Sequence, residues 1–519
     1  MRFIPSVLLP VGVGLFILLA LMPPTASAHG YVQRFSPPLP LGWYLGSAAA
    51  VVVLSFLLSH ILNRSVASQR RLPTVNFDVN LLPKRTQIAW RMEPLKKGFT
   101  PVVQMVSLLV FVVVLLSGFI GDQSPIHNFA PTFVWVIFWV GIPLVCACFG
   151  NVWVLLNPWK IVFTIAEFAF MRIHSNAKRE AVIKYKEEWN VWPAVFLFFC
   201  FAWVENIYQD SIVPLNLASL IAAYSLTTWI GMLTFGTRDW LRFGDPFSVL
   251  FNLLSYCSIL ELSASTPSIC ETCSEYCRPQ SGTCTGCISC FIRTGPGTRG
   301  FKLRIFGSGV IGNKYSSGAQ TVFLLLVLAT LTADGFFATS TWLSLSQRFV
   351  SHVPNVTMMG SFALFSAPIL FYGLYRVAMA LTPRLGGFSD SSTELGNIFA
   401  ITLLPIAVSY HLAHFHYFLL MQGQSIIPLV SDPFGFGWNV FGTANYRMNA
   451  AILSPNVSWS FMVFAIVVGH VVAVYAVHKI AMRRFGEHSA VFIGLIPILA
   501  LMTAYTVLSL WVMAQPMMA

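Results

Sequence analysis

The stretch Ser409-Tyr-His-Leu-Ala-His-Phe-His-Tyr-Phe-Leu-Leu-Met-Gln-Gly-Gln424 closes a longer apolar run. Such a run predicts a helix that crosses a membrane, and it places His411, His414 and His416 inside the bilayer. At about 1.5 Å per residue, His411 lies roughly 15 Å from Met421, near the middle of a hydrocarbon core about 30 Å thick. His411 and His414 are three residues apart and share one helix face, whereas His416 is turned away.

Histidines at this depth need a physical reason, because ionisable side chains in a bilayer are costly unless they pair, bind a metal or line a wet cavity. Imidazole is also the commonest side-chain metal ligand. Two interpretations therefore stand side by side. The histidines form a metal or catalytic site, or they only make hydrogen bonds to neighbouring helices.

The whole chain has the composition of a membrane protein. Of its 519 residues, 56% are hydrophobic and 10% are charged, and the mean hydropathy is +0.71. We therefore expect an all-α, polytopic helical membrane protein rather than a soluble enzyme. Ten apolar runs of spanning length predict about ten transmembrane helices, at 41–62, 101–121, 131–149, 192–213, 214–236, 319–342, 357–380, 395–421, 457–480 and 489–513.

Residues 1–28 are typical of a secretory signal peptide. Arg2 gives the charged start, an apolar region follows, and Ala26-Ser-Ala28 is a small-residue cleavage site. Cleavage there would make His29 the mature N-terminus, where its amine and ring nitrogen together form a chelate for copper. The alternative is that His29 is only a solvated terminus.

Basic residues predict the orientation. Starting from an extracytoplasmic N-terminus, the loops 63–100, 160–190 and 237–318 fall on the cytoplasmic side and carry eight, six and eight Lys/Arg residues. The extracytoplasmic segments of the mature chain hold only three arginines. We expect a multi-pass protein of the cell inner (plasma) membrane. The net charge of +12 therefore reflects cytoplasmic loops, and no basic face interleaved with aromatics remains for nucleic acid.

The predicted organisation has two transmembrane blocks of five helices, 29–260 and 301–519, separated by a cysteine-rich loop at 261–300. Within the first block, Asn157-Pro158 should break a helix, since the residue before proline is pushed out of the α region. Trp153 and Trp159 flank this break, and we expect them at the level of the lipid headgroups.

Two acidic residues lie in the outer halves of predicted spans. Glu205 is near the end of the fourth span, and Asp334 is in the sixth. His470, in the ninth span, lies within reach of the depth of His411. We predict that Glu205 and Asp334 are catalytic carboxylates and that His411, His414 and His470 bind a metal beside them. The alternative for Glu205 is a helix that simply leaves the membrane at this point.

Six of the ten cysteines fall within 21 residues, at Cys270, Cys273, Cys277, Cys284, Cys287 and Cys290. Thiolates at this spacing suit zinc or an iron–sulfur cluster, and the pattern does not separate the two. The loop is predicted to be cytoplasmic, where disulfides are uncommon. Disulfides would be the natural interpretation only if the loop were outside. A protein partner through this loop is a further possibility.

Several motifs in order resemble those of the integral membrane proteins called fenitrothion hydrolase. They are Ala-His-Gly at the signal end, Gly-Asn-Val-Trp with Asn-Pro-Trp, Arg-Asp-Trp-Leu-Arg-Phe-Gly-Asp-Pro-Phe-Ser, Ala-His-Phe-His-Tyr-Phe, Gln-Gly-Gln and Val-Ser-Asp-Pro-Phe-Gly. The resemblance runs from about residue 27 to residue 480. It implies cleavage of the aryl phosphorothioate ester of organophosphate triesters such as fenitrothion. The cysteine loop is an insertion relative to the commoner members.

A metal-assisted phosphotriesterase fits these residues, because the reaction needs an activated hydroxide and a Lewis acid on the phosphoryl group. Zinc or copper at the histidines would supply both, and an apolar small-molecule substrate would reach the site through the lipid bilayer. Two other functions stay open. One is copper transport or metal-site maturation through His29, the membrane histidines and the cysteines. The other is a membrane redox subunit with haem and an iron–sulfur cluster.

Overall fold

The computed structural model describes residues 39–63, 75–77, 98–174, 181–264, 284–294, 299–312, 316–350, 355–486 and 489–515. Within these ranges, nine helices are long and apolar enough to cross a membrane. The predicted all-α, multi-pass membrane fold is therefore confirmed.

The first half of the chain is built from α2 (Leu41–Asn63), β1 (Val75–Phe77), α4 (Thr100–Ile120), α5 (Phe129–Thr132), η3 (Phe133–Gly141), α6 (Ile142–Phe149), α7 (Trp153–Leu156), α8 (Pro158–Ile173), η4 (Glu187–Trp189), α9 (Trp192–Asn206), η5 (Gln209–Ile212), α10 (Pro214–Phe235), α11 (Thr237–Asp239), η6 (Trp240–Gly244), α12 (Pro246–Leu254) and η7 (Ser255–Cys257).

The second half is built from β2 (Leu260–Ala264), β3 (Cys284–Thr285), α14 (Ile288–Arg293), β4 (Arg299–Leu303), α15 (Gly309–Gly312), α16 (Gly318–Phe337), α17 (Ser340–Val350), α18 (Val356–Gly386), α19 (Ser392–Ala400), η9 (Ile401–Leu403), α20 (Leu404–Gln422), η10 (Gly423–Ser425), α21 (Ile426–Ser431), α22 (Pro455–Phe485), α23 (Ser489–Gly494) and α24 (Ile496–Ala514).

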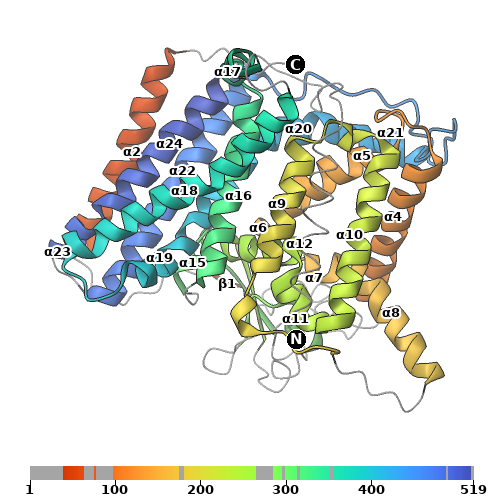
Figure 1. The fold of residues 1–519 in the computed structure, drawn as a ribbon, viewed down its shortest axis with the longest axis horizontal. Coiled ribbons are helices and arrows are strands. Elements are labelled where there is room, and N and C mark those ends of the chain that lie inside the picture. The colour runs from red at the N-terminus through yellow and green to blue at the C-terminus, as the bar shows by residue number, and fades with distance from the viewer. Residues whose placement is uncertain are drawn as a thin grey trace.

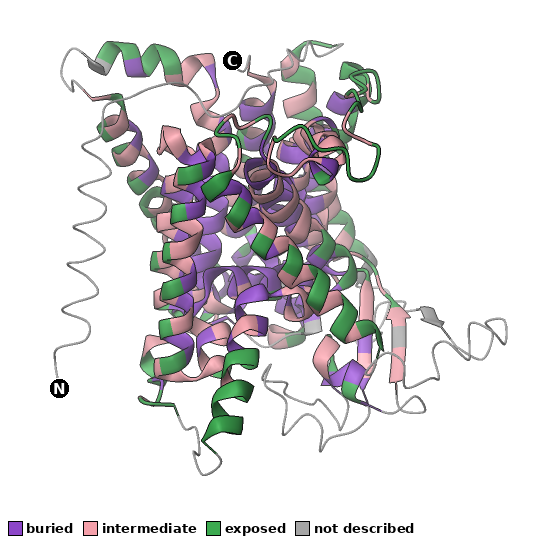
Figure 2. Ribbon diagram, turned by 90° about the vertical axis from the view of Figure 1, so that its right-hand side faces the viewer, coloured by how far each residue is buried: buried purple, intermediate pink, exposed green. Residues whose placement is uncertain are grey.

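The long helices form one bundle in which α16 and α20 are central (Figure 1). Over an 18-residue stretch, 78% of the residues are buried in α16 and 89% in the span Ser392–Ser431 that contains α20, against 22% in α4. Buried residues accordingly gather inside the bundle and exposed ones on its outer faces (Figure 2). The histidine helix α20 is therefore surrounded by protein, where polar side chains can find partners.

The helix α2 packs mainly against helices that lie far from it in the sequence. This first helix packs against α22 and α24 near the other end of the sequence. Phe56 stacks on Phe492 with ring centroids 4.9 Å apart, and Tyr44 meets Trp459 edge-on at 5.3 Å. Apolar composition alone gives no information on which helices become neighbours.

The helix found in the predicted span 192–213 is shorter than expected. Its helix, α9, has 15 residues and ends at Asn206, and a 3-10 turn, η5, follows before Pro214 begins α10. At 1.5 Å per residue α9 is about 22 Å long. Its last turn carries Glu205, so this carboxylate lies inside the bundle beside α16 rather than beyond it.

A small sheet lies at the end of the bundle that is predicted to be cytoplasmic (Figure 1). Its antiparallel strands run in the order β1-β4-β2-β3, with Leu260 paired to Leu303 and Ala264 to Cys284. We did not predict this sheet. The signal was the alternation in Leu-Glu-Leu-Ser-Ala264 and Arg-Gly-Phe-Lys-Leu303, which has the period of two expected for strands.

Candidate functional site

An acid–imidazole pair joins the two central helices. His414 Nε2 on α20 lies 2.7 Å from Asp334 Oδ2 on α16, and the two side chains are only 9% and 11% exposed. The next residue, Gly335, lies at a close approach of helices, because a Cβ there would come within 2.9 Å of both the Tyr410 hydroxyl and Val512 Cγ1. The pair depends on the close approach of helices whose contacting residues are 80 positions apart.

Glu205 on α9 adds a second carboxylate. It is buried, with 8% of its surface exposed, and it interacts electrostatically with Asp334. Its Oε2 lies 3.4 Å from Asn206 Nδ2, and the Trp139 indole is a second polar neighbour. Two carboxylates buried together repel each other, and a shared proton or a bound cation relieves that repulsion.

Two polar atoms beside this pair lack a hydrogen-bond partner among the described residues, namely His414 Nδ1 and the Tyr410 hydroxyl, and both are buried. The rings of Tyr410 and His414 are stacked one helical turn apart, with centroids at 6.0 Å. A buried polar atom without a partner costs about 1–3 kcal/mol. These two atoms therefore have unused hydrogen-bonding capacity beside the Asp334–His414 contact.

His411 is placed differently from His414. Its Nε2 lies 3.3 Å from the Val140 carbonyl oxygen, and its ring meets Trp139 edge-on at 5.7 Å. Val140 and Trp139 belong to η3, a nine-residue π-helix, and such segments are frequent at functional sites. His411 therefore lies within electrostatic range of His414 and Asp334, but its hydrogen bond goes to the backbone. We refer to Glu205, Asp334, Tyr410 and His414 as the acid–imidazole cluster.

The other predicted membrane histidine, His470, does not touch the pair directly. Its Nδ1 lies 2.8 Å from the Ile466 carbonyl oxygen, and its ring is 5.8 Å from the Tyr505 ring. Tyr505 in turn lies 6.2 Å from Tyr410, ring to ring. His416 faces elsewhere, as expected, with Nε2 2.6 Å from Ser458 Oγ.

The histidines and carboxylates do not form a ready-made metal site. Within the described ranges, only Cys284, Cys287 and Cys290 form a set of three His, Cys, Asp or Glu residues whose ligand atoms all lie within 4.8 Å. Cys284 and Cys290 are buried and Cys287 is half-buried. The remaining predicted metal ligands, His29, Cys270, Cys273 and Cys277, lie outside the described residues.

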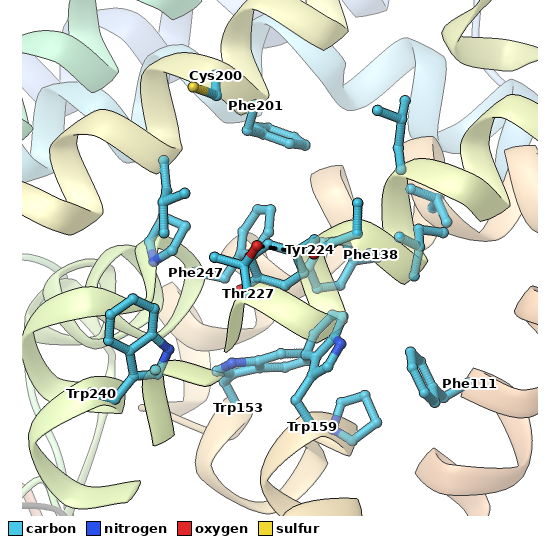
Figure 3. A pocket seen from close by; sticks show the side chains of 18 of the residues that line it. Phe111, Phe138, Trp153, Trp159, Cys200, Phe201, Tyr224, Thr227, Trp240 and Phe247 are labelled. Atoms are coloured by element: carbon cyan, nitrogen blue, oxygen red, sulfur yellow. Dashed lines mark hydrogen bonds between the residues drawn. The ribbon is translucent and has the colours of Figure 1, made fainter. Parts of the chain in front are cut away.

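A large apolar cavity of about 1460 Å³ opens between α4, α9, α10 and the short helices below them (Figure 3). Its lining includes Phe138, Trp153, Trp159 and Tyr224. Trp153 and Trp159 are 4% and 7% exposed, so both are buried within the protein, and their position at headgroup level stays a prediction. Trp159 Nε1 donates to Ser225 Oγ at 2.7 Å, whereas Trp153 Nε1 is buried without a hydrogen-bond partner among the described residues.

One layer of aromatic side chains separates the cavity from the acid–imidazole cluster. Phe201 lines the cavity and meets Trp139 at 4.6 Å between ring centroids. Trp139 in turn touches His411. Neither Asp334 nor His414 lines the cavity. The sequence shows the aromatic residues but not the space between them.

The short helices at the cavity floor begin at capped positions. The Asn157 side chain accepts a hydrogen bond from Lys160 N at 3.0 Å, and Asp245 accepts one from Ser248 N at 2.9 Å. Each cap precedes a proline at the first helical position. The predicted break at Asn157-Pro158 is therefore present, and it turns the chain beneath the cavity.

Comparison of the chain with known protein families, with curated proteins and with solved structures finds no match.

Proposed function

We propose that this protein is a membrane-embedded hydrolase of apolar esters, with organophosphate triesters of the fenitrothion type as the substrate class. The observation that carries the proposal is the buried Asp334–His414 pair, whose outer imidazole nitrogen has no described partner. An Asp–His pair of this form is the general-base unit of many hydrolases. The substrate class comes from the motif resemblance.

In this mechanism His414 is the base. Nε2–H donates to Asp334, which fixes the tautomer and leaves the lone pair of Nδ1 to accept a proton from water. The resulting hydroxide attacks phosphorus, the bond from phosphorus to the aryl oxygen breaks, and the phenolate leaves. The proton on His414 then passes to the phenolate. Asp334 acts as the positioning residue and stabilises the imidazolium.

Tyr410 is proposed to stabilise the charge that develops during the reaction. Its hydroxyl lies beside the pair without a described partner, so it is available to donate a hydrogen bond to the charge that develops on oxygen or sulfur. Glu205 interacts with Asp334 and would hold or release a proton as the charge of the cluster changes.

The substrate would arrive through the bilayer. An apolar triester partitions into lipid, and the cavity of about 1460 Å³ is large enough to hold a small organic ester with room to spare. Phe201 and Trp139 form the layer between this cavity and the cluster. A change in the Trp139 side chain would join the two spaces.

A metal at His411, His414 and His470 stays a prediction. The donor types suit zinc or copper, but the described ligand atoms do not gather within 4.8 Å around one point. No step of the proposed mechanism depends on a metal there.

The test is hydrolysis of fenitrothion by purified protein in detergent, with His414→Ala compared with His416→Ala. His416 lies on the same helix and makes its own hydrogen bond to Ser458, so it is a matched control. We expect His414→Ala to lower turnover by about 100-fold or more and His416→Ala to change it by less than about threefold.

Size-exclusion chromatography of both variants separates a chemical loss from misfolding. Turnover that persists in a folded His414→Ala protein contradicts the assigned base. Absence of hydrolysis by the parent protein, reconstituted in vesicles with zinc, copper or iron added in turn, contradicts the proposed function as a whole.

A further inference from the structure

Three cysteines at the far end of the bundle from the acid–imidazole cluster share one small volume. Cys284 is in β3, Cys287 precedes α14, and Cys290 lies in its first turn. All pairs of their sulfur atoms lie within 4.8 Å of each other. The positive φ of Gly286, 78°, makes the tight turn between the first two cysteines.

One hydrogen bond at this site has a cysteine sulfur as its acceptor. Cys290 N–H donates to Cys287 Sγ at 3.4 Å, so the start of α14 is capped by a sulfur atom. Gly286 N–H donates to the Leu262 carbonyl oxygen at 2.7 Å, which fixes the turn on β2. The backbone N–H directed at Cys287 Sγ favours the thiolate of this residue, the form that binds metals.

The spacing distinguishes a single ion from an iron–sulfur cluster. With Zn–S bonds of about 2.3 Å, sulfurs at the corners of a tetrahedron lie roughly 3.8 Å apart. The three described sulfurs meet this requirement with small adjustments. A cluster holds its cysteine sulfurs farther apart, because iron and sulfide atoms lie between them.

The site is connected to the cavity floor through α14. Phe291 and Ile292 of this helix form an apolar cluster with Leu262 of β2, and Leu155 of α7 packs against it. The neighbours of Leu155 in α7, Trp153 and Leu156, line the cavity. Because α14 has only six residues, its own backbone hydrogen bonds are too few to hold it.

We propose that Cys284, Cys287 and Cys290 bind one ion of the zinc class, and that this ion fixes α14 against α7 beneath the apolar cavity. The three thiolates fill three of the four tetrahedral positions. This site shares no residue with the proposed hydrolytic site, so its metal content can be tested independently of hydrolysis.

The first test measures metal in the full-length protein purified with zinc present and without a chelator. We expect about one zinc per chain by mass spectrometry of the elements. Replacement by Co²⁺ should give the sulfur-to-cobalt charge-transfer absorption of a thiolate site. Cys284→Ser/Cys287→Ser/Cys290→Ser should lose both signals, whereas Cys148→Ser/Cys200→Ser, whose cysteines lie elsewhere in the fold, should keep them.

The second test needs no variant, and so it holds even if the triple variant does not fold. Hydrogen exchange of the peptide that covers 150–157 is compared before and after removal of zinc from the parent protein. We expect at least about tenfold faster exchange without zinc, and recovery when zinc is returned.

Three results would overturn the proposal. They are a parent protein without zinc, iron with inorganic sulfide in place of zinc, and zinc retained by the folded triple variant. Unchanged exchange at 150–157 after zinc removal would overturn the connection to the cavity floor.

Discussion

Two of the acid–base pairs among the described residues, Asp334–His414 and Asp390–Arg484, differ in whether their polar atoms all have partners. Asp334 and His414 meet between α16 and α20, with 11% and 9% of their side chains exposed. Asp390 and Arg484 join the turn before α19 to the end of α22, with 16% and 25% exposed. The first contact is 2.7 Å long and the second 2.8 Å.

The arginine pair is closed. Arg484 Nε donates to Asp390 Oδ2 and Nη2 donates to Oδ1 at 2.9 Å, and Nη2 also reaches Glu394 at 2.5 Å. The imidazole pair is open, since His414 Nδ1 and the Tyr410 hydroxyl lack described partners. Contacts of similar length therefore occur in two different settings. A pair with its donors satisfied stabilises the fold, and a buried pair with unused atoms is suited to chemistry.

The loss of turnover should differ most between Asp334→Asn, in the open pair, and Asp390→Asn, in the closed pair. The amide keeps the shape and a hydrogen bond to Nε2, but it removes the charge that orients His414 and stabilises its protonated form. We expect turnover of a fenitrothion-type ester to fall by about 1000-fold. Asp390→Asn is the matched control and should stay within about twofold of the parent. Equal turnover in both variants would remove the distinction.

Tyr410→Phe tests whether an unused hydroxyl has a function. If the hydroxyl were idle, its removal would leave stability unchanged or raise it by about 1 kcal/mol, because an unpaired buried group disappears. As a donor to the developing charge, it should also support turnover, which we expect to fall by about 100-fold. Thermal unfolding and hydrolysis are measured on the same preparation. A more stable variant with unaltered turnover would assign Tyr410 to packing alone.

Ala223→Trp tests whether the substrate reaches the open pair, Asp334 and His414, through the apolar cavity. Ala223 lines the cavity on α10, and an indole there would occupy space that the substrate needs. We expect the KM for an apolar ester to rise about tenfold with the thermal midpoint little changed. Leu226→Trp is the control on the same helix, because Leu226 is 58% exposed on the outer face. A similar rise in both variants would argue against entry through the cavity.

The sequence predicted the residue types of the open pair but not its geometry. Asp334 and His414 were identified because charge in an apolar run is visible locally. Their contact depends on the packing of α16 against α20, which no local pattern encodes. His470 has a comparable depth and composition, yet its Nδ1 contacts its own helix.

The cavity and the sheet were missed for a related reason. An aromatic residue such as Trp153 suits the headgroup level and the protein interior equally well, and only the packing of its neighbours decides between them. The alternation at Leu260–Ala264 was visible, but its partner strand β4 begins 35 residues beyond the end of β2. Membrane spans are predicted well because twenty apolar residues act together, whereas sites depend on a few distant contacts.

Asp390→Asn should have the smallest effect and a defined dependence on pH. The hydrogen bonds from Arg484 hold the pKa of Asp390 below its ordinary value. A carboxyl whose pKa is lower in the folded state stabilises the fold above its unfolded pKa of about 4, and this contribution is lost as the pH falls through the folded value. At pH 7 the variant should be less stable than the parent by about 1 kcal/mol.

This difference should shrink below about pH 4 and vanish once Asp390 is protonated in both states. Thermal unfolding in detergent from neutral to acidic pH measures it directly. Glu394→Gln, which changes a half-exposed partner of the same arginine, should lower stability by less than about 0.5 kcal/mol. A difference that grows at acidic pH would have the wrong sign for a lowered pKa. It would show that the charge of Asp390 opposes folding, and the closed pair would lose its structural role.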